Sequence, residues 1–506
     1  MKMRHIYIFI IFSFISTLFV SCSDLEEEIY SETVVENFYN NKEEIIGAYT
    51  RPWAHTQWVL PLTIFQLSEL SADAAVIPTK SDGSHYSDGK NIAFHEHKWT
   101  SEHPTIDNAW AITWEGIGFV NGVLEGIAPV DFEDKQMPIS KAEMTAELRC
   151  LRAYWHLIAC DLWGNVPITT KVSDPAYPAT NTRKEVYEFI ETELLASIDD
   201  LPVKKHVETY GYFTKAGART LLAKLYLNSK VYADAEHYSQ CIEMCDKVIS
   251  VGNYELDENW QDPFLPTNEF SKENIFAFAL DGVTGWSYNI SAFTLPNVLK
   301  NKFGLQFDPF NEMYTVEEFY DSYNDLDKRK EQYLVGPQYG EDPNTPLVTI
   351  DKHITSITDA GLEEGARNYK HVFGENSQGH IHESDLVVLR FTDVILMKAE
   401  ALMRLNGGTA TQEAVDLVNQ IRKRAFGANY EANKYTTVNL TMDELLAERG
   451  REFAYEGQRR TDLIRFGKFT GTRWAKDNVS EDYRTLFPIP LKQTNLNPNL
   501  DQNPNY

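Results

Sequence analysis

The stretch TKAGARTLLAKLYL, residues 214–227, carries the pattern on which the fold depends. Its apolar residues recur at three- and four-residue spacing, which predicts an amphipathic helix. Asn228 follows directly and is a typical residue at a helix end. Residues 233–251 have the same periodicity, so the two segments predict a pair of helices packed against each other.

Small and bulky residues alternate in this pair as they do in tetratricopeptide repeats. Ala223 and Ala235 stand where the two helices would touch, with Leu222 and Tyr226 beside them. Two further pairs look similar, 386–405 with 412–425 and 141–162 with 183–201, although their connections differ in length. The sequence therefore predicts a mainly α fold, an irregular tetratricopeptide-like helical-repeat scaffold. A generic helical bundle is the alternative that these spacings leave open.

Further helices are predicted at 41–57, 105–127 and 442–453. Typical start residues precede three of the predicted helices: Ser140 before 141–162, Thr182 before 183–201 and Thr441 before 442–453. Few segments alternate as strands do. Short strands are expected at 166–170, 275–278, 347–350 and 487–489. Between the helices, 72–104 and 257–385 are loop-like and rich in polar and aromatic residues. Long loops on a rigid scaffold are typical of binding surfaces.

Composition excludes several classes of protein. The 506 residues are 43% hydrophobic and 24% charged. These fractions are ordinary for a globular chain and argue against disorder. The formal net charge of −27 predicts repulsion from phosphate backbones. Nucleic acid is therefore not an expected partner.

The amino terminus predicts export. Lys2 and Arg4 precede IFIIFSFISTLFV at 8–20, which is too short to span a membrane but has the length of a signal-peptide core. Ser21-Cys22 then resembles a bacterial lipoprotein cleavage site, with Cys22 as the lipidated residue. An ordinary secretory signal followed by a chance cysteine is the alternative. The acidic run SDLEEE at 23–28 is either a solvated linker or resembles the tag of surface-directed lipoproteins.

No residue pattern points to catalysis, a cofactor or a metal. A glycoside hydrolase needs two opposed carboxylates, but no acidic residue stands in a context that singles it out. His95, His97 and His103 form the best metal candidate, and we interpret them as exposed polar residues instead. The four cysteines past Cys22 are predicted to be small core residues; they are Cys150, Cys160, Cys241 and Cys245.

Sugars are recognised by aromatic rings that stack on apolar C–H faces and by polar side chains that satisfy hydroxyl groups. Trp286, Tyr288 and Asn289 form the densest cluster of this kind. A loop whose rings pack back onto the scaffold is the alternative interpretation.

Six motifs occur in order along the chain: ELRCLRAYWHLIACDLWGNVPI at 147–168, TKAGARTLLAKLYL at 214–227, LRFTDVILMKAEA at 389–401, NQIRKRA at 419–425, ERGREFAYEGQRRTDLIR at 448–465, and a tail with FPIP at 487–490 and NPNLDQNP at 497–504. Together they resemble the SusD/RagB family of surface glycan-binding lipoproteins. Charged residues recur in the fifth at three- and four-residue spacing. We interpret that recurrence, with Arg390, Asp393 and Glu400, as a partly shielded ion-pair network and not as an active site.

The resemblance implies a lipoprotein at the outer face of the outer membrane, lipidated at Cys22. Such a protein binds an oligosaccharide or related nutrient and delivers it to a SusC-like TonB-dependent transporter barrel, without catalysis. In relatives the ligand loops correspond to 73–100 and 281–320. The candidate ligand-binding residues are therefore Asp73, Tyr86, Trp99, Trp286, Tyr288 and Asn289.

The expected organisation is a signal peptide at 1–21, a lipid anchor with an acidic linker at 22–40 and a single SusD-like domain at 41–506. Within that domain we expect the repeat scaffold mainly at 41–256 and 386–425, the loop-rich ligand-binding part at 257–385 and a C-terminal segment at 426–506. Two other functions stay open: a surface glycoside hydrolase, and an interaction scaffold that binds only protein.

Overall fold

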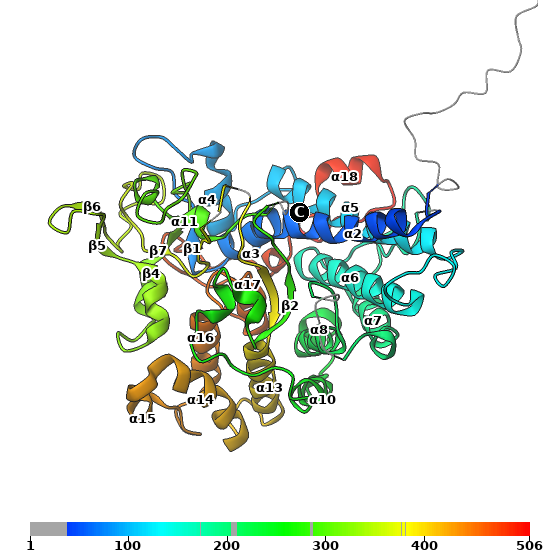
Figure 1. The fold of residues 1–506 in the computed structure, drawn as a ribbon. Coiled ribbons are helices and arrows are strands. Elements are labelled where there is room, and N and C mark those ends of the chain that lie inside the picture. Colours follow the sequence, from blue (N-terminus) through cyan, green and yellow to red (C-terminus); the bar gives the residue numbers. More distant parts are fainter. Residues whose placement is uncertain (1–37, 173, 204–209, 284–286, 376, 380) are drawn as a thin grey trace, which may run out of the picture.

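Helices dominate the computed structural model, which describes residues 38–172, 174–203, 210–283, 287–375, 377–379 and 381–506 (Figure 1). The predicted signal peptide, Cys22 and Trp286 lie outside the described residues. The longer helices are α2 (Lys42–Val59), α5 (Pro104–Ile127), α6 (Lys141–Leu162), α7 (Arg183–Leu195), α8 (Lys215–Leu227), α10 (Tyr238–Ile249), α13 (Phe391–Leu405), α14 (Gln412–Phe426) and α16 (Met442–Glu452). The shorter helices include α3 (Phe65–Leu70), α4 (Lys90–His95), α9 (Ser229–Ala233), α11 (Ser291–Thr294), α12 (Glu317–Asp321), α15 (Tyr430–Asn433), α17 (Arg459–Arg465) and α18 (Leu491–Leu496).

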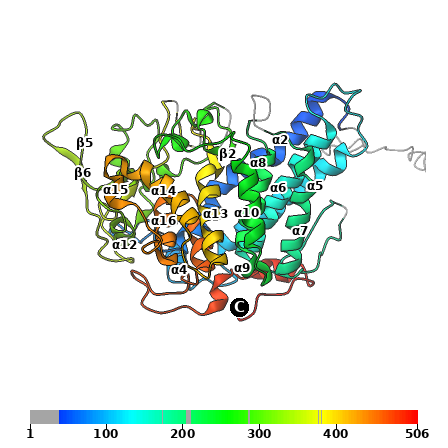
Figure 2. The same cartoon turned by 90° about the horizontal axis from the view of Figure 1, so that it is seen from below.

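The predicted helix pairs are confirmed. Helix α8 packs on α10, α6 on α7, and α13 on α14, and further contacts between α10 and α13 and between α5 and α6 join the pairs. Figure 2 shows α13, α10, α8, α6 and α5 side by side in one row. The helical-repeat architecture follows from these contacts, because each helix buries its apolar stripe against a sequence neighbour.

Close helix contacts depend on small residues. Ala223 on α8 is fully buried, as predicted, and so are Ala399 on α13 and Ala414 on α14. Ala235, which was predicted to touch the neighbouring helix, is only partly buried and lies before α10 begins at Tyr238, so that part of the prediction is wrong. At Gly116 on α5, an added Cβ would lie 2.5 Å from the indole of Trp155 on α6. A glycine is therefore required there for the two helices to approach.

The predicted helix start signals are also confirmed. The side chains of Ser140, Thr182 and Thr441 each accept a hydrogen bond from the backbone N–H three residues later. Thr182 and Glu185 form a complete capping box. These caps satisfy amide groups that the first turn of a helix leaves without partners.

Several predicted boundaries are wrong. Residues 386–390 form strand β8 (Leu386–Arg390) and not the start of a helix, because β8 pairs antiparallel with β2 (Asn274–Phe278). The helix predicted at 183–201 ends at Leu195, and the one predicted at 233–251 begins at Tyr238. Tertiary contacts decide such boundaries, and local propensity does not record them.

Two strand predictions are confirmed and two are wrong. Strands form at β2 and at β6 (Pro346–Ile350), whereas 166–170 makes only an isolated bridge through Val166 and 487–489 forms no strand. The remaining strands are β1 (Ala75–Val76), β3 (Tyr314–Thr315), β4 (Tyr333–Leu334), β5 (Gly336–Tyr339) and β7 (Arg367–Asn368). Within the described residues, each sheet has two antiparallel strands, paired β1–β3, β2–β8, β4–β7 and β5–β6.

One hydrophobic cluster runs through most of the described chain, from Ile45 on α2 to Ile489 near the carboxyl end. The four cysteines past Cys22 are buried and unpaired, as predicted. In the part of the chain that the structure describes, no helix combines the length and the apolar character that crossing a bilayer requires.

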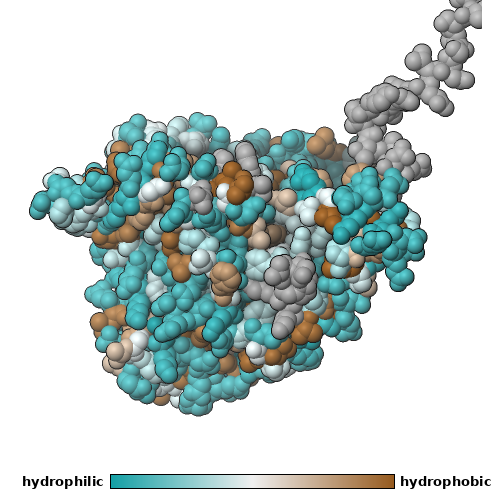
Figure 3. Space-filling model, in the orientation of Figure 1, coloured by the Kyte–Doolittle hydropathy of each residue, from teal (hydrophilic) through white to brown (hydrophobic). Residues whose placement is uncertain are grey.

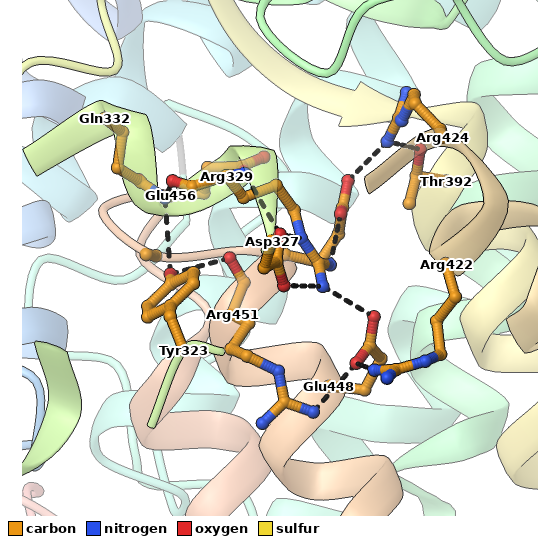
Figure 4. A network of polar contacts seen from close by, with 12 residues as sticks. Tyr323, Asp327, Arg329, Gln332, Thr392, Arg422, Arg424, Glu448, Arg451 and Glu456 are labelled. Atoms are coloured by element: carbon orange, nitrogen blue, oxygen red, sulfur yellow. Dashed lines mark hydrogen bonds and ion pairs between the residues drawn. The ribbon is translucent and has the colours of Figure 1, made fainter. Parts of the chain in front are cut away.

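A buried ion-pair network ties α16 to distant segments, as the charge spacing predicts. Arg329 contacts the carboxylates of Asp327, Glu448 and Glu452 at 2.7–2.9 Å, and Arg390 contacts Glu452 at 2.8 Å. Figure 4 shows Arg329 between Asp327 and Glu448, with Arg422 and Arg451 on the other side of Glu448. The network therefore fixes the segment around 327–332 and strand β8 onto α16.

Electrostatics in the network favour the charged carboxylates. Burial alone would raise the pKa of Glu448, but the charges of Arg329, Arg451 and Arg422 outweigh it and bring the pKa to about 2. At Glu452, too, the positive charges of neighbouring arginines outweigh the effect of burial and hold the pKa well below its usual range. Removing one member would leave an uncompensated buried charge, which is strongly destabilising.

Candidate ligand-binding surface

The two loop regions predicted to bind ligand meet in space. Strand β1 pairs with β3, with Ala75 opposite Thr315 and Val76 opposite Tyr314. Beyond the strands, the side-chain nitrogen Nζ of Lys80 donates a hydrogen bond to the carbonyl of Asn311. Segments 73–100 and 281–320 therefore pack against each other through buried residues, although more than 200 positions separate them.

Four half-buried aromatic rings form a continuous arc on this surface: Trp58, Tyr288, Phe310 and Phe307. Neighbouring ring centroids are 5.3 Å apart for Trp58 and Tyr288, 6.3 Å for Tyr288 and Phe310, and 6.4 Å for Phe310 and Phe307. We call these four residues the aromatic arc. At these distances the rings contact one another in tilted and edge-to-face arrangements, and each keeps part of its apolar surface exposed.

The aromatic arc is held in place by packing on a buried ring and by backbone hydrogen bonds. The ring of Tyr288 stacks on buried Phe293 with centroids 5.5 Å apart. Phe310 N–H donates to the carbonyl of Ala292 at 2.8 Å, and Glu312 N–H donates to that of Phe293 at 2.8 Å. These backbone bonds hold the segment that carries Phe310 against α11, so the rings are positioned before any ligand arrives.

Polar groups lie beside the rings. Burial raises the pKa of the Glu312 carboxyl, and the charge of Lys80 partly opposes that shift. Burial, together with the nearby Arg367, lowers the pKa of Lys80 to about 6. The backbone N–H of Glu312 donates to the carbonyl of Phe293, whose ring stacks on Tyr288, so Glu312 belongs to the segment that supports the arc. A carboxylate there can accept hydrogen bonds from ligand hydroxyl groups.

Tyr86 is presented on a strained turn near this surface. Its side chain is 58% exposed. Its neighbours His85 and Ser87 have φ values of 58° and 42°, in the left-handed region that non-glycine residues rarely adopt. Such strain often marks functional loops. Of the six predicted ligand residues, Tyr86 and Tyr288 thus have accessible rings.

Three other predicted ligand residues have structural partners. Trp99 is 1% exposed, and its indole N–H donates to the phenol oxygen of Tyr506 at 2.7 Å. Asn289 is 2% exposed and caps the following turn by accepting from Ser291 N–H at 2.9 Å. A buried ring or amide offers no face to a ligand, so the prediction that Trp99 and Asn289 contact ligand is corrected.

Asp73, another predicted ligand residue, also has a structural partner. Its carboxylate forms a bidentate ion pair with Arg459, with oxygen–nitrogen distances of 2.7 and 2.8 Å. Its carboxylate therefore joins the end of α3 to α17. Trp286 lies outside the described residues, so its role stays a prediction.

The histidines predicted to be exposed are buried. Ring nitrogens of His95, His97 and His103 hydrogen-bond to backbone carbonyls of Trp474, Ser71 and Lys90 at 2.6, 2.9 and 3.1 Å. Burial lowers the pKa of His95 to about 4 and that of His97 to about 2, so both are neutral at physiological pH. His95 and His97 connect the end of α4 to the carboxyl-terminal region and to α3.

Sequence reasoning missed Trp58, Phe307, Phe310 and Glu312. Trp58 stands directly after the predicted helix end, where α2 passes into a π-helical turn at Leu60–Ile64. Such turns are frequent at functional sites. A tryptophan at a helix end was the available signal for Trp58, whereas Phe310 and Glu312 carry none beyond their place in an aromatic loop.

Two family models match this chain. The model described as "SusD family" matches residues 253–506, which is half of the chain. The chain belongs to the SusD family. A second model, "Starch-binding associating with outer membrane", matches residues 24–227 of this SusD-family protein.

Among relatives, this SusD-family chain is 27% identical to the starch-binding protein SusD of Bacteroides thetaiotaomicron, over 71% of this chain and 72% of that protein. A SusD-like protein of Bacteroides ovatus is 21% identical over 92% and 84%. Among solved structures, surface glycan-binding protein A of Bacteroides thetaiotaomicron has a TM-score of 0.75 at 21% identity, covering 93% of this chain and 100% of that one. The same protein in complex with laminarihexaose has a TM-score of 0.74 at 21% identity and covers 92% and 99%.

Proposed function

We propose that this protein captures an oligosaccharide at the cell surface through the aromatic arc and Tyr86. The observation that carries the proposal is the arc itself, whose neighbouring ring centroids are 5.3, 6.3 and 6.4 Å apart. Aromatic rings that keep part of their apolar surface exposed suit contact with the apolar C–H faces of sugars. Relatives whose names and structures record starch and laminarihexaose support this class of ligand. Glu312 supplies an acceptor for hydroxyl groups beside the rings.

The proposal extends to delivery and location. The protein is lipidated at Cys22, lies at the outer face of the outer membrane and hands its ligand to a SusC-like TonB-dependent transporter. The cleavage-site pattern at Ser21-Cys22 supports the lipid anchor. The description of the second family model, which names outer-membrane association, supports the location. We propose no catalytic step, since the relatives are named for binding.

A polysaccharide-binding screen tests the capture role. The chain from residue 23 onward would be run through gels that contain neutral, amine-bearing or acidic polysaccharides. We expect retardation by one polysaccharide class, and Trp58→Ala should weaken it by about 0.5–1.5 kcal/mol, the worth of one aromatic contact, while the protein still unfolds cooperatively. Exposed Val438→Ala is the matched control and should keep full binding. A wild-type protein that no polysaccharide retards would contradict the proposal.

Delivery is tested in membranes. Full-length protein and a Cys22→Ala variant would be isolated with detergent from the producing cells, and co-purifying barrels identified. We expect membrane recovery and a stable barrel partner for the wild type, and loss of membrane recovery for the variant. Recovery of the variant in the membrane fraction would contradict anchoring through Cys22.

A further inference from the structure

One buried side chain, that of Lys80, connects the turn that carries Tyr86 to the aromatic arc. Lys80 stands shortly before Tyr86 in the chain and is 2% exposed. Its Nζ donates a hydrogen bond to the carbonyl of Asn311, which directly follows Phe310 of the arc. A side chain with so little exposed surface does not contact a bound glycan itself. Any influence of Lys80 on binding is therefore exerted through the residues that it holds.

The backbone of Lys80 closes the start of the same turn. Its N–H donates to the carbonyl of Ser84 at 3.0 Å, and its carbonyl accepts from the N–H of Gly83 at 2.8 Å. Further along the turn, His85 has a φ of 58°. A residue in the left-handed region keeps that conformation only where surrounding contacts hold it. Moving Lys80 would therefore move the base of the turn that presents Tyr86.

The Lys80 side chain has a fixed direction. Its Nζ lies 3.8 Å from the centroid of the Tyr314 ring, and the guanidinium carbon of Arg367 lies 3.5 Å from the same centroid. Tyr314 is fully buried on β3, and its hydroxyl donates to the carbonyl of Gly361 at 3.0 Å. A ring held in this way gives the Lys80 side chain a rigid surface. The bond from Nζ to Asn311 therefore forms with most of the rotamer freedom of Lys80 already lost to packing.

The arc is fixed independently of Lys80. Asn311 N–H donates to the carbonyl of Leu295 at 2.9 Å, and both neighbours of Asn311 donate to carbonyls of α11. These backbone bonds do not involve Lys80, so Phe310 keeps its place when Nζ of Lys80 is removed. The bond from Lys80 to Asn311 therefore positions the turn on the arc, and not the arc on the turn.

A second contact joins the turn to the arc. Burial lowers the pKa of the His85 imidazole, and a hydrogen bond with the backbone of Phe310 partly opposes that shift. By contrast, Ser81 at the base of the turn bonds away from the arc, to the carbonyl of Ala360 at 2.8 Å. Loss of the bond from Lys80 would therefore loosen the turn on the arc without detaching it.

Apolar side chains are scattered among polar ones on the face of the molecule drawn in Figure 3, and its described residues do not gather into one large apolar patch. A glycan on a surface of this kind depends on a small number of rings, and each ring contributes only about 0.5–1.5 kcal/mol. The fixed separation of those rings therefore matters more to affinity than a broad apolar area does.

We propose that Lys80 is a positioning residue of the glycan site, which holds the Tyr86 turn at a fixed separation from the aromatic arc so that Tyr86 and Phe310 contact the same ligand. This inference rests on the proposed capture of glycans and adds that two distant loop regions form one preorganised site. Preorganised groups bind more tightly because less freedom is lost when the ligand arrives. Lys80 acts through Tyr86 and does not touch the ligand.

A double-mutant cycle between Lys80 and Tyr86 tests this role. Lys80→Met keeps an unbranched stem and removes Nζ, and Asn311 is half-buried, so water can replace the lost donor. The probe is whichever of starch, laminarin, xylan, mannan, chitosan and polygalacturonate retards the wild type most in the gel screen. We expect Lys80→Met to lower affinity for it about threefold in the wild type, and by less than about 1.5-fold in Tyr86→Ala.

The matched control is Lys476→Met. Lys476 is 5% exposed, and its Nζ donates to the carbonyls of Gly471 and Asn478 at 2.8 Å each, which belong neither to the arc nor to the Tyr86 turn. This variant should keep its affinity within about 1.5-fold. Thermal unfolding shows that each variant folds. Lys80→Gln, with a shorter side chain, carries the same prediction if Lys80→Met does not fold.

Different results separate the two proposals. Unchanged affinity in Lys80→Met, or an equal loss in Lys476→Met, would overturn the positioning role while capture of glycans stands. Equal losses from Lys80→Met in the wild type and in Tyr86→Ala would also overturn it, because Lys80 would then not act through Tyr86. If no probe retards the wild type, the proposed function fails, and the positioning role that rests on it fails too.

Discussion

The indole N–H of Trp99 donates a hydrogen bond to the phenol oxygen of Tyr506 at 2.7 Å, across 407 positions of the chain. The hydroxyl of Tyr506 in turn donates to the carbonyl of Leu486 at 2.6 Å. The last residue of the chain thus closes a buried contact with the loop after α4. Trp99 therefore contributes to stability and not to a sugar-binding face.

We expect Trp99→Ala to lower the free energy of unfolding by about 3–5 kcal/mol, because a fully buried indole is lost. Trp99→Phe should lower it less, since the ring volume is largely kept and one hydrogen bond worth about 1 kcal/mol is lost. Urea titration followed by fluorescence measures both.

Tyr86→Ala is the matched control, because the Tyr86 side chain is 58% exposed. This substitution should change the free energy of unfolding by less than about 0.5 kcal/mol, as surface changes usually do. Equal stability losses in Trp99→Ala and Tyr86→Ala would contradict the structural role of Trp99.

The aromatic arc makes a separate prediction about affinity. Tyr288→Ala should weaken binding of the preferred oligosaccharide by about 0.5–1.5 kcal/mol, the worth of one aromatic contact. Tyr288→Phe should keep most of the affinity because the ring face remains. Isothermal titration with both variants distinguishes stacking from a role of the hydroxyl group. Equal losses in the two variants would show that the hydroxyl, and not the ring, binds the ligand.

Glu452 is the test of the ion-pair network. Its carboxylate contacts Arg329, Arg390 and Arg424 at 2.7–2.8 Å. We expect Glu452→Gln to destabilise the protein by about 3–5 kcal/mol, since three buried cations lose a shared counter-charge. Chemical denaturation measures the loss.

The control for Glu452 is an ion pair at the surface. Glu413→Gln removes a half-exposed partner of Lys398, which keeps its ion pair with Asp246. Its cost should be at most about 1 kcal/mol, because water screens the Glu413 carboxylate and Lys398 retains a counter-charge. Similar losses in Glu413→Gln and Glu452→Gln would contradict a network shielded from water.

The raised pKa of the buried Glu147 carboxyl predicts that the stability of the protein depends on pH. It is fully buried, accepts a hydrogen bond from the hydroxyl of Tyr49, and has its pKa raised from 4.5 to about 8 by burial. Because the folded state holds the proton more tightly than the unfolded state, this group stabilises the protein below pH 4.5. That contribution is lost as pH rises from 4.5 towards 8.

The Glu147→Gln variant removes this dependence. We expect its stability relative to the wild type to improve steadily between about pH 5 and pH 8, as measured by urea unfolding at several pH values. Exposed Glu43→Gln at the start of α2 is the control and should show no such trend. A stability difference between Glu147→Gln and wild type that is constant over this range would show that Glu147 is not protonated in the folded state.

Local sequence signals predicted the helical scaffold well because helix formation depends on near neighbours. The periodicity of 214–227 and the caps at Ser140 and Thr182 act within one or two turns. The charge spacing of 448–465 likewise predicted a shielded network. By contrast, the assignment of 386–390 to a helix failed, since its strand partner β2 lies more than 100 positions earlier.

The candidate site was predictable as two regions and not as residues. Pairing of β1 with β3 brings the two predicted loops together, but Trp58 enters from α2 and was not foreseen. Phe310 and Glu312 acquire their positions from backbone bonds to 292–293. Such bonds depend on how the loops fold over the scaffold, which local patterns do not encode.

The sequence by itself determined the helix pairs, the small residues between them, the charged network and the family to which the chain belongs. All of these depend on spacing along the chain or on motifs preserved in order. Only the tertiary structure decided which rings are available to a ligand. Trp99 and Tyr86 are both loop aromatics, yet the first is 1% exposed and the second 58%. The difference arises because contacts with segments hundreds of residues away set the burial of each ring.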